Sequence, residues 1–149
     1  MWYVDPLLHC SWVMHSPQDC DTMQSIGRGI SMQLAAYKGR SRMVVLGLGM
    51  TGFSVVRWAR KHAWNIIVVD SRLHPPAKSR LQHAYADVTL YTPDHVTIQK
   101  DDVVIVSPGL PPHTDWVQAI VQQVDLVLTD MDIFCATVEK THSGLLLDR

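Results

Sequence analysis

The sequence predicts an α/β fold in which a parallel sheet of about five strands carries helices on both faces. Three observations predict it: short apolar runs alternate with amphipathic segments, each run has the length of a strand, and a glycine or an acidic residue closes several of them. Apolar residues make up 47% of the 149 residues, which is enough for a sizeable core. The expected strands are 43–47, 66–70, 88–91, 103–106 and 126–128, and the expected helices are 51–63, 77–85, 114–123 and 130–139.

The helix expected at 51–63 shows the amphipathic pattern most clearly. Phe53, Val56 and Ala59 share one face, whereas basic side chains occupy the opposite face. Such a stripe predicts a helix packed against the sheet on one side and open to water on the other.

Four residues of the helices have specific expected roles. Thr114 precedes an apolar segment and is a candidate N-cap. Trp58 and Trp116 are expected to cover the packing between helices and sheet, and Cys135 lies on the apolar side of the last helix. Cys135 is therefore expected to be a core residue and not a nucleophile.

Charge and cysteine content exclude several classes of protein. Thirteen Lys and Arg against fourteen Asp and Glu give a net charge of -1, so no electrostatic footprint predicts a nucleic-acid partner. No apolar run is long enough to cross a membrane. Three cysteines without a CxxC pair indicate a reducing, cytoplasmic setting, and the eight histidines show no metal-ligand spacing.

The two ends of the chain differ in texture from its centre. Residues 1–32 show neither strand nor helix periodicity, and we expect them to be an irregular extension. Either Met32 is the native start, or the extension is natural. Residues 33–139 are expected to form the α/β domain, followed by a divergent tail at 140–149.

A glycine motif links the first expected strand to the first expected helix. Gly47-Leu-Gly49-Met-Thr-Gly52 matches GxGxxG in that context, which predicts a Rossmann-like, phosphate-binding turn. Gly47 would permit the tight turn, Gly49 would let the backbone approach a phosphate, and Gly52 would let the helix pack close to the strand. Unpaired N–H groups of the helix, with about half a positive charge, would then face the anion.

Asp70 ends the second strand, 70 − 52 = 18 residues after the last glycine of the motif. An acid at this position accepts hydrogen bonds from ribose hydroxyls in dinucleotide-binding enzymes. The motif and Asp70 alone therefore predict an NAD(P)-binding Rossmann module of a redox enzyme or sensor, and this alternative stays open at the level of the sequence.

Four motifs in a fixed order point elsewhere. They are Gly-Leu-Gly-Met-Thr-Gly-Phe-Ser at 47–54, Val-Asp-Ser-Arg at 69–72 with Pro75-Pro76, Val-Ser-Pro-Gly at 106–109, and Thr-Asp-Met-Asp-Ile-Phe at 129–134. Together they resemble the N-terminal domain of the Mur ligases, and among these the D-glutamate-adding members of cytoplasmic peptidoglycan synthesis. The resemblance covers about residues 33–138.

The resemblance implies that the carboxyl edge of the sheet holds the UDP end of UDP-N-acetylmuramoyl-L-alanine. It places the diphosphate at the helix N-terminus, the uracil and ribose at the end of the second strand, and the closing wall at the end of the fourth. It assigns no catalytic residue and no metal ligand here. The implied binding residues are Gly49, Met50, Thr51, Gly52, Asp70, Ser71, Arg72, Ser107, Pro108 and Gly109.

The full-length family uses ATP and Mg²⁺ to phosphorylate a carboxylate, which the amine of D-glutamate then attacks. That chemistry needs a GxxxxGK[ST] loop, and the sequence contains none. We therefore expect a non-catalytic UDP-binding fragment that binds neither ATP nor Mg²⁺. A frameshift near residue 140 is one hypothesis for the ending, and another chain is one conceivable source of the remaining domains.

Overall fold

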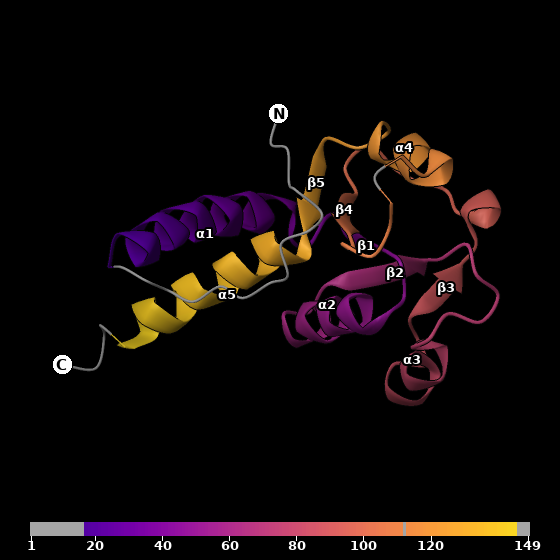
Figure 1. The fold of residues 1–149 in the computed structure, drawn as a ribbon, viewed down its shortest axis with the longest axis horizontal. Coiled ribbons are helices and arrows are strands. Elements are labelled where there is room, and N and C mark those ends of the chain that lie inside the picture. The colour runs from indigo at the N-terminus through magenta and orange to yellow at the C-terminus, as the bar shows by residue number, and fades with distance from the viewer. Residues whose placement is uncertain (1–16, 112, 146–149) are drawn as a thin grey trace.

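The computed structural model describes residues 17–111 and 113–145. Residues 1–16, which belong to the expected irregular extension, and the last four residues of the expected tail lie outside this part. The elements, shown in Figure 1, are α1 (Pro17–Tyr37), β1 (Arg42–Leu46), α2 (Met50–Lys61), β2 (Asn65–Val69), α3 (Lys78–Ala84), β3 (Thr89–Tyr91), the short 3-10 helix η1 (Pro93–His95), β4 (Val103–Val106), α4 (Asp115–Val121), β5 (Leu126–Thr129) and α5 (Asp130–Leu145).

The five strands form one parallel sheet in the order β3-β2-β1-β4-β5. Val44 at the centre of β1 is paired with Ile67 of β2 on one side and Val104 of β4 on the other. Each expected strand is present within one or two residues of its expected bounds, so the α/β, Rossmann-like fold class is confirmed.

Alternate residues of the central strands supply two hydrophobic clusters, one on each face of the sheet. Met43 and Val45 pack with α1, α2, α3 and α5, whereas Val44 and Leu46 pack with α4. All four of these β1 side chains are fully buried, and β1 after Arg42 is apolar without alternation because both faces of the sheet are covered. The expectation of helices on both faces is confirmed.

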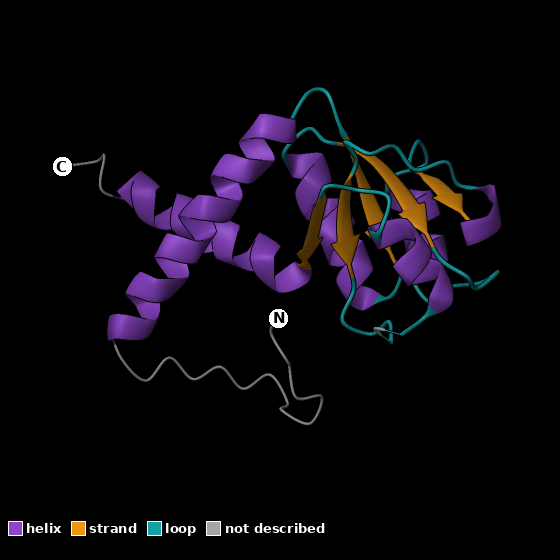
Figure 2. Cartoon of the chain, turned by 90° about the horizontal axis from the view of Figure 1, so that it is seen from above, coloured by secondary structure: helices purple, strands orange, loops and turns teal. Residues whose placement is uncertain are grey.

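The helix α1 differs from the expectation for the N-terminal region. An irregular extension was expected up to residue 32, and this is wrong for residues 17–32, which lie in α1. Ile30 and Leu34, one turn apart, are buried, and α1 crosses α5 as both extend away from the sheet (Figure 2). The contact with α5, about a hundred residues later in the chain, stabilises α1. No local sequence pattern predicts this helix.

At the other end, α5 continues to Leu145 instead of ending at residue 139. The helix therefore includes the first part of the expected tail, and no break in the structure marks the expected boundary. No helix in the described part of the chain combines the length and the apolar character that crossing a bilayer requires.

Several side-chain expectations can be compared directly with the structure. Trp58 and Trp116 pack against the clusters on opposite faces, and Cys135 is buried, as expected. Burial, helped by nearby Asp132, raises the pKa of the Cys135 thiol, which favours the unreactive neutral form. Thr114 is the N-cap residue of α4, but its hydroxyl donates to the carbonyl oxygen of Pro111 (2.8 Å) and caps no helix amide.

An ion pair lies where the strands begin, at the edge opposite their carboxyl ends. Asp102 is fully buried. Its carboxylate accepts hydrogen bonds from Nε and Nη2 of Arg42, at 3.1 and 2.7 Å, and from the backbone N–H of Gln99, at 2.8 Å. The hydrogen bond to Asp102 raises the pKa of Arg42. Asp101 and Asp102 directly precede β4 and therefore sit away from the ligand edge, and the pairing of Asp102 with Arg42 joins β4 to β1.

Candidate functional site

A cavity of about 390 Å³ opens at the carboxyl edge of the sheet. The cavity lies at the ends of β1 and β4, which are neighbours in the sheet. The connection after β1 runs to one face of the sheet and the connection after β4 to the other. Open α/β sheets bind ligands at such a position. Every predicted binding residue except Asp70 and Pro108 lines it. The lining consists of Gly47, Gly49, Met50, Thr51, Gly52, Ser71, Arg72, Ser107, Gly109 and Leu110.

The glycine turn has the geometry expected of a phosphate-binding turn. Gly47 has a φ of 89°, in the left-handed region, and its N–H donates to the carbonyl oxygen of Val69 (2.8 Å). A Cβ on Gly52 would overlap the carbonyl oxygen of Gly47, whereas a Cβ on Gly49 would have no atom within 4 Å. The first and third glycines are therefore required by the backbone, and the second leaves space open at the cavity wall.

The N-terminus of α2 faces this cavity without a capping side chain. Gly49 is its N-cap and supplies no side-chain acceptor, and the first turn contains no acidic residue. The first N–H groups of a helix have no acceptor within the helix, and they carry the positive end of its dipole. Since Met50, Thr51 and Gly52 line the cavity, this end of α2 is suited to an anion.

Asp70 lies behind the cavity wall and is only 2% exposed. Its Oδ2 accepts from the N–H of Leu48 and from Nη2 of Arg72, each at 2.8 Å. Its Oδ1 accepts from the backbone N–H of Arg72 at 2.8 Å and from Nε at 3.0 Å. The carboxylate thus ties the glycine turn to Arg72, and Arg72, half exposed, lines the cavity in its place.

The hydrogen bonds of Asp70 suit a supporting role, and its direct contact with the ligand stays a prediction. Direct contact with the ribose or uracil was the expectation, but both carboxylate oxygens already accept two hydrogen bonds each. Asp70 therefore positions the turn and the Arg72 guanidinium. The spacing of the motif predicts an acid at this strand end. It does not predict which hydrogen-bond donors surround that acid.

Two opposing effects act on the ionisation of Asp70. Burial opposes the charged form, but the hydrogen bonds from Arg72 and from the amide of Leu48 outweigh it, and the pKa of Asp70 is lowered. The same hydrogen bond to Asp70 raises the pKa of Arg72. The pair therefore stays fully charged at neutral pH.

The lowered pKa predicts that Asp70 stabilises the fold in a pH-dependent way. The contribution is complete above the unfolded pKa of about 4 and is lost as pH falls through the lower folded value. Asp70→Asn is therefore expected to lower the urea midpoint at pH 7 and to have a smaller effect at pH 2–3. A difference between wild type and variant that is constant over pH 2–7 contradicts this prediction.

The loop after β4 closes the cavity from the other side. The Ser107 hydroxyl, which is buried, donates to the carbonyl oxygen of Gly47 at 3.3 Å and connects the two loops. Leu110, which the sequence did not single out, lies close to Gly47 and lines the cavity, whereas Pro108 does not. The only sequence signal for Leu110 was its position after the strand-end glycine.

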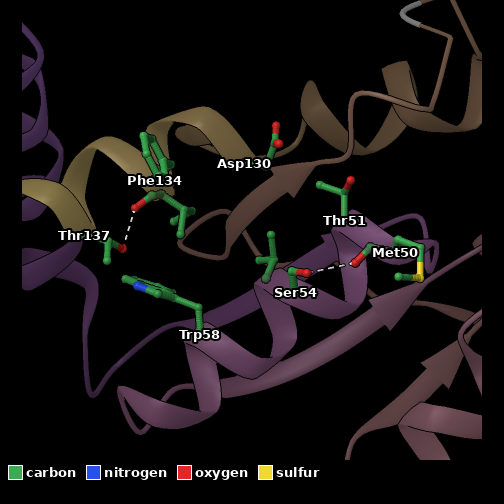
Figure 3. Close-up of a pocket in the computed structure, with 9 residues that line it drawn as sticks. Met50, Thr51, Ser54, Trp58, Asp130, Phe134 and Thr137 are labelled. Carbon is green, nitrogen blue, oxygen red and sulfur yellow. Dashed lines mark hydrogen bonds between the residues drawn. The ribbon is translucent and has the colours of Figure 1, made fainter. Parts of the chain in front are cut away.

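A second cavity of about 410 Å³ borders the turn on its other side, between α2 and α5 (Figure 3). Met50 and Thr51 line both cavities. Trp58 and Phe134 give the second one aromatic walls, and Asp130 contributes a carboxylate. The sequence did not predict it, because α2 and α5 are far apart in the chain and only the sheet brings them together.

No group of three or more His, Cys, Asp or Glu side chains suited to a metal ion occurs among the described residues. The sequence also holds no GxxxxGK[ST] loop of the kind that binds ATP.

Comparison with known proteins adds independent information. A family model described as "Mur ligase MurD-like, N-terminal domain" matches residues 41–128. The UDP-N-acetylmuramoylalanine--D-glutamate ligases of Methylococcus capsulatus and Thiobacillus denitrificans are 38% and 36% identical over 101 and 107 residues. These matches cover 66% and 70% of this chain but 22% of each relative, so the chain spans about a fifth of their length.

A solved structure, the L-tryptophan dehydrogenase of Nostoc punctiforme, aligns with a TM-score of 0.43 and 16% identity over 90% of this chain and 52% of that one. This similarity is too low to bear on function. The match to the family model, in contrast, covers more than half of the chain and includes the glycine turn, the β2 end and the β4 loop. The chain belongs to the Mur ligase family, as a MurD-like N-terminal domain.

Proposed function

We propose that this chain is a non-catalytic nucleotide-binding domain whose cavity at the carboxyl edge takes the UDP part of UDP-N-acetylmuramoyl-alanine. The relatives carry this substrate in their names. The observation that supports it most is the N-terminus of α2, which has no capping side chain and no acid in its first turn and lines one cavity together with Arg72. A helix N-terminus and an arginine side by side favour a diphosphate and its nucleoside.

Each side of the cavity has a proposed part in binding. The amides of Met50, Thr51 and Gly52 would donate to the diphosphate, and Gly49 would let it approach the backbone. Ser71 and Arg72 would contact the nucleoside, with the planar guanidinium beside the base. Asp70 would act only through the turn and Arg72, and the 107–109 loop would close the wall.

The NAD(P) alternative fits the geometry less well. A dinucleotide site of that kind needs an acid at the end of β2 that is free to accept from the ribose hydroxyls. Asp70 accepts instead from Leu48 and Arg72 and is almost fully buried. Because an arginine at this place can also bind the 2′-phosphate of NADP, the occupied Asp70 argues against NAD in particular.

The proposal predicts that Arg72→Gln weakens UDP binding about ten-fold, because a charge-assisted contact is lost, roughly 1.4 kcal/mol. Isothermal titration of the full chain with UDP, UDP-N-acetylmuramoyl-alanine and NADH measures this. We expect the two uridine ligands to bind and NADH to bind more weakly or not at all.

Arg57→Gln is the matched control, since Arg57 is exposed on α2 and does not line the cavity. Its affinity for UDP is expected to equal that of wild type. Tighter binding of NADH than of UDP would contradict the proposal and favour the redox alternative. An equal loss of UDP affinity in the Arg72 and Arg57 variants would also contradict the proposal.

The wider activity of the family is not assigned to these residues. We propose that binding resides within residues 33–139 and that amide-bond formation, with its ATP and Mg²⁺, requires parts found in the full-length relatives. A second chain carrying those parts is a proposed partner, and a cytoplasmic location is the setting that this substrate implies.

A further inference from the structure

Arg80, an exposed residue of α3, lies against the residue that begins α2. Its Nη1 is 3.5 Å from Sδ of Met50, and its guanidinium carbon is 5.1 Å from the centroid of the Phe53 ring. Met50 is the first residue of α2 (Figure 3) and lines the cavity at the carboxyl edge of the sheet, although Arg80 itself does not line it. The guanidinium therefore lies beside this cavity, one side chain away from the first N–H groups of α2.

The charge of Arg80 has no carboxylate partner in the part of the chain that the structure describes. None of the ion pairs found there includes it. The Met50 sulfur is a weak hydrogen-bond acceptor, and the Phe53 ring offers its face to the cation. These contacts hold the guanidinium in place, but neither of them cancels its charge.

The position of this charge is unusual for a cation. A helix dipole has its positive end at the N-terminus, so a cation placed there is repelled. The first turn of α2 contains no acid that would reduce this repulsion. Arg72 lines the same cavity, but its charge is balanced by Asp70 at 2.8 Å. Arg80 therefore adds an uncompensated positive charge to this side of the cavity.

An anion beside the start of α2 would be attracted by the helix N-terminus and by Arg80 together. This attraction grows with the charge of the ligand, so a diphosphate gains more from it than a monophosphate does. We propose that Arg80 is a specificity-determining residue of this cavity, whose charge makes the cavity favour a nucleoside diphosphate over the monophosphate. The inference rests on the proposed function and adds to it the residue that selects the charge of the ligand.

The test is isothermal titration of the full chain, as wild type and as Arg80→Gln, with UDP, UMP and inorganic pyrophosphate. The variant is expected to bind UDP and pyrophosphate about five-fold more weakly and UMP about two-fold more weakly, because the lost attraction grows with ligand charge. Arg80→Lys keeps the positive charge and is expected to stay within about two-fold of wild type for all three ligands.

The dependence on salt separates an effect of charge from a structural effect. Between about 0.01 M and about 1 M salt the Debye length falls from about 30 Å to about 3 Å. The difference in UDP affinity between wild type and Arg80→Gln is therefore expected to become much smaller over this range. A difference that is the same at both salt concentrations contradicts the proposal.

Arg60→Gln is the matched control. The Arg60 guanidinium also lies over an aromatic ring, 6.0 Å from the Tyr85 centroid, but it is paired with Asp87 at 2.7 Å. Arg60 belongs to the last turn of α2 and does not line the cavity. Its variant removes the same formal charge and is expected to bind all three ligands as wild type does. A loss as large as that of Arg80→Gln would show a general effect of net charge and overturn the proposal.

The outcomes distinguish this inference from the proposed function. UDP binding that is unchanged in Arg80→Gln, or weakened by the same factor as UMP binding, overturns the role of Arg80 and leaves the nucleotide function standing. Pyrophosphate binding that depends on Arg80, without any binding of UDP, supports the role of Arg80 and contradicts the nucleotide function. Binding of none of the three ligands to wild type overturns both.

Discussion

Gly52→Ala is expected to lower the free energy of unfolding by about 2–3 kcal/mol, even though alanine is the better helix former by about 1 kcal/mol. The reason is steric. An added Cβ would overlap the carbonyl oxygen of Gly47, and that atom belongs to a backbone turn that cannot rotate away as a side chain would. Either α2 moves away from β1 or the turn opens, and both displace the helix N-terminus from the cavity.

Urea denaturation of the two proteins measures the stability, and titration with UDP measures the accompanying loss of affinity. Gly29→Ala is the matched control, since Gly29 also lies inside a helix but has no atom within 4 Å of an added Cβ. That variant is expected to gain up to about 1 kcal/mol. A Gly52→Ala protein as stable as wild type would show that the close contact between α2 and the turn does not exist.

Asp102→Asn is expected to cost about 2–4 kcal/mol, because it leaves Arg42 without its counter-ion at a buried site. Asparagine keeps the volume, but it removes the charge and places an NH₂ group opposite a donor. Arg42 is 31% exposed at its side chain and can recover part of its hydration, which keeps the loss below that of a fully buried pair.

The adjacent Asp101→Asn is the control for this experiment. Asp101 is exposed, whereas Asp102 is fully buried, so the same chemical change at the neighbouring position is expected to alter stability by less than about 0.5 kcal/mol. Chemical denaturation of both variants at pH 7 gives the comparison. Equal losses in the two would indicate a general effect of net charge and not a buried ion pair. Binding of UDP is expected to be unchanged in both, since the pair lies at the opposite edge of the sheet.

Local patterns predicted the sheet and its ligand edge well. The five strands are short, apolar and closed by turn residues, and these features depend on neighbours in the chain. The glycine motif likewise predicted the turn, because the positive φ of Gly47 and the crowding at Gly52 are requirements of a turn six residues long. Ser71, Arg72, Ser107 and Gly109 line one cavity because parallel strands end at a common edge, and their role in binding stays a prediction.

The helix α1 and the role of Asp70 were not predicted, and the reason is the same for both. The contacts that stabilise α1 come from α5, at the far end of the chain. The donors that occupy Asp70 include the amide of Leu48, which reaches the carboxylate only once β1 and β2 are paired.

The order of residues thus determined which segments are strands, which turn holds the glycines and which family the motifs resemble. Tertiary packing alone decided that Asp70 supports the site from behind while Arg72 faces the cavity. It also formed the cavity between α2 and α5. Hydrogen-bond partners and cavity walls come from residues that are distant in the chain, and their positions depend on how the sheet and helices pack.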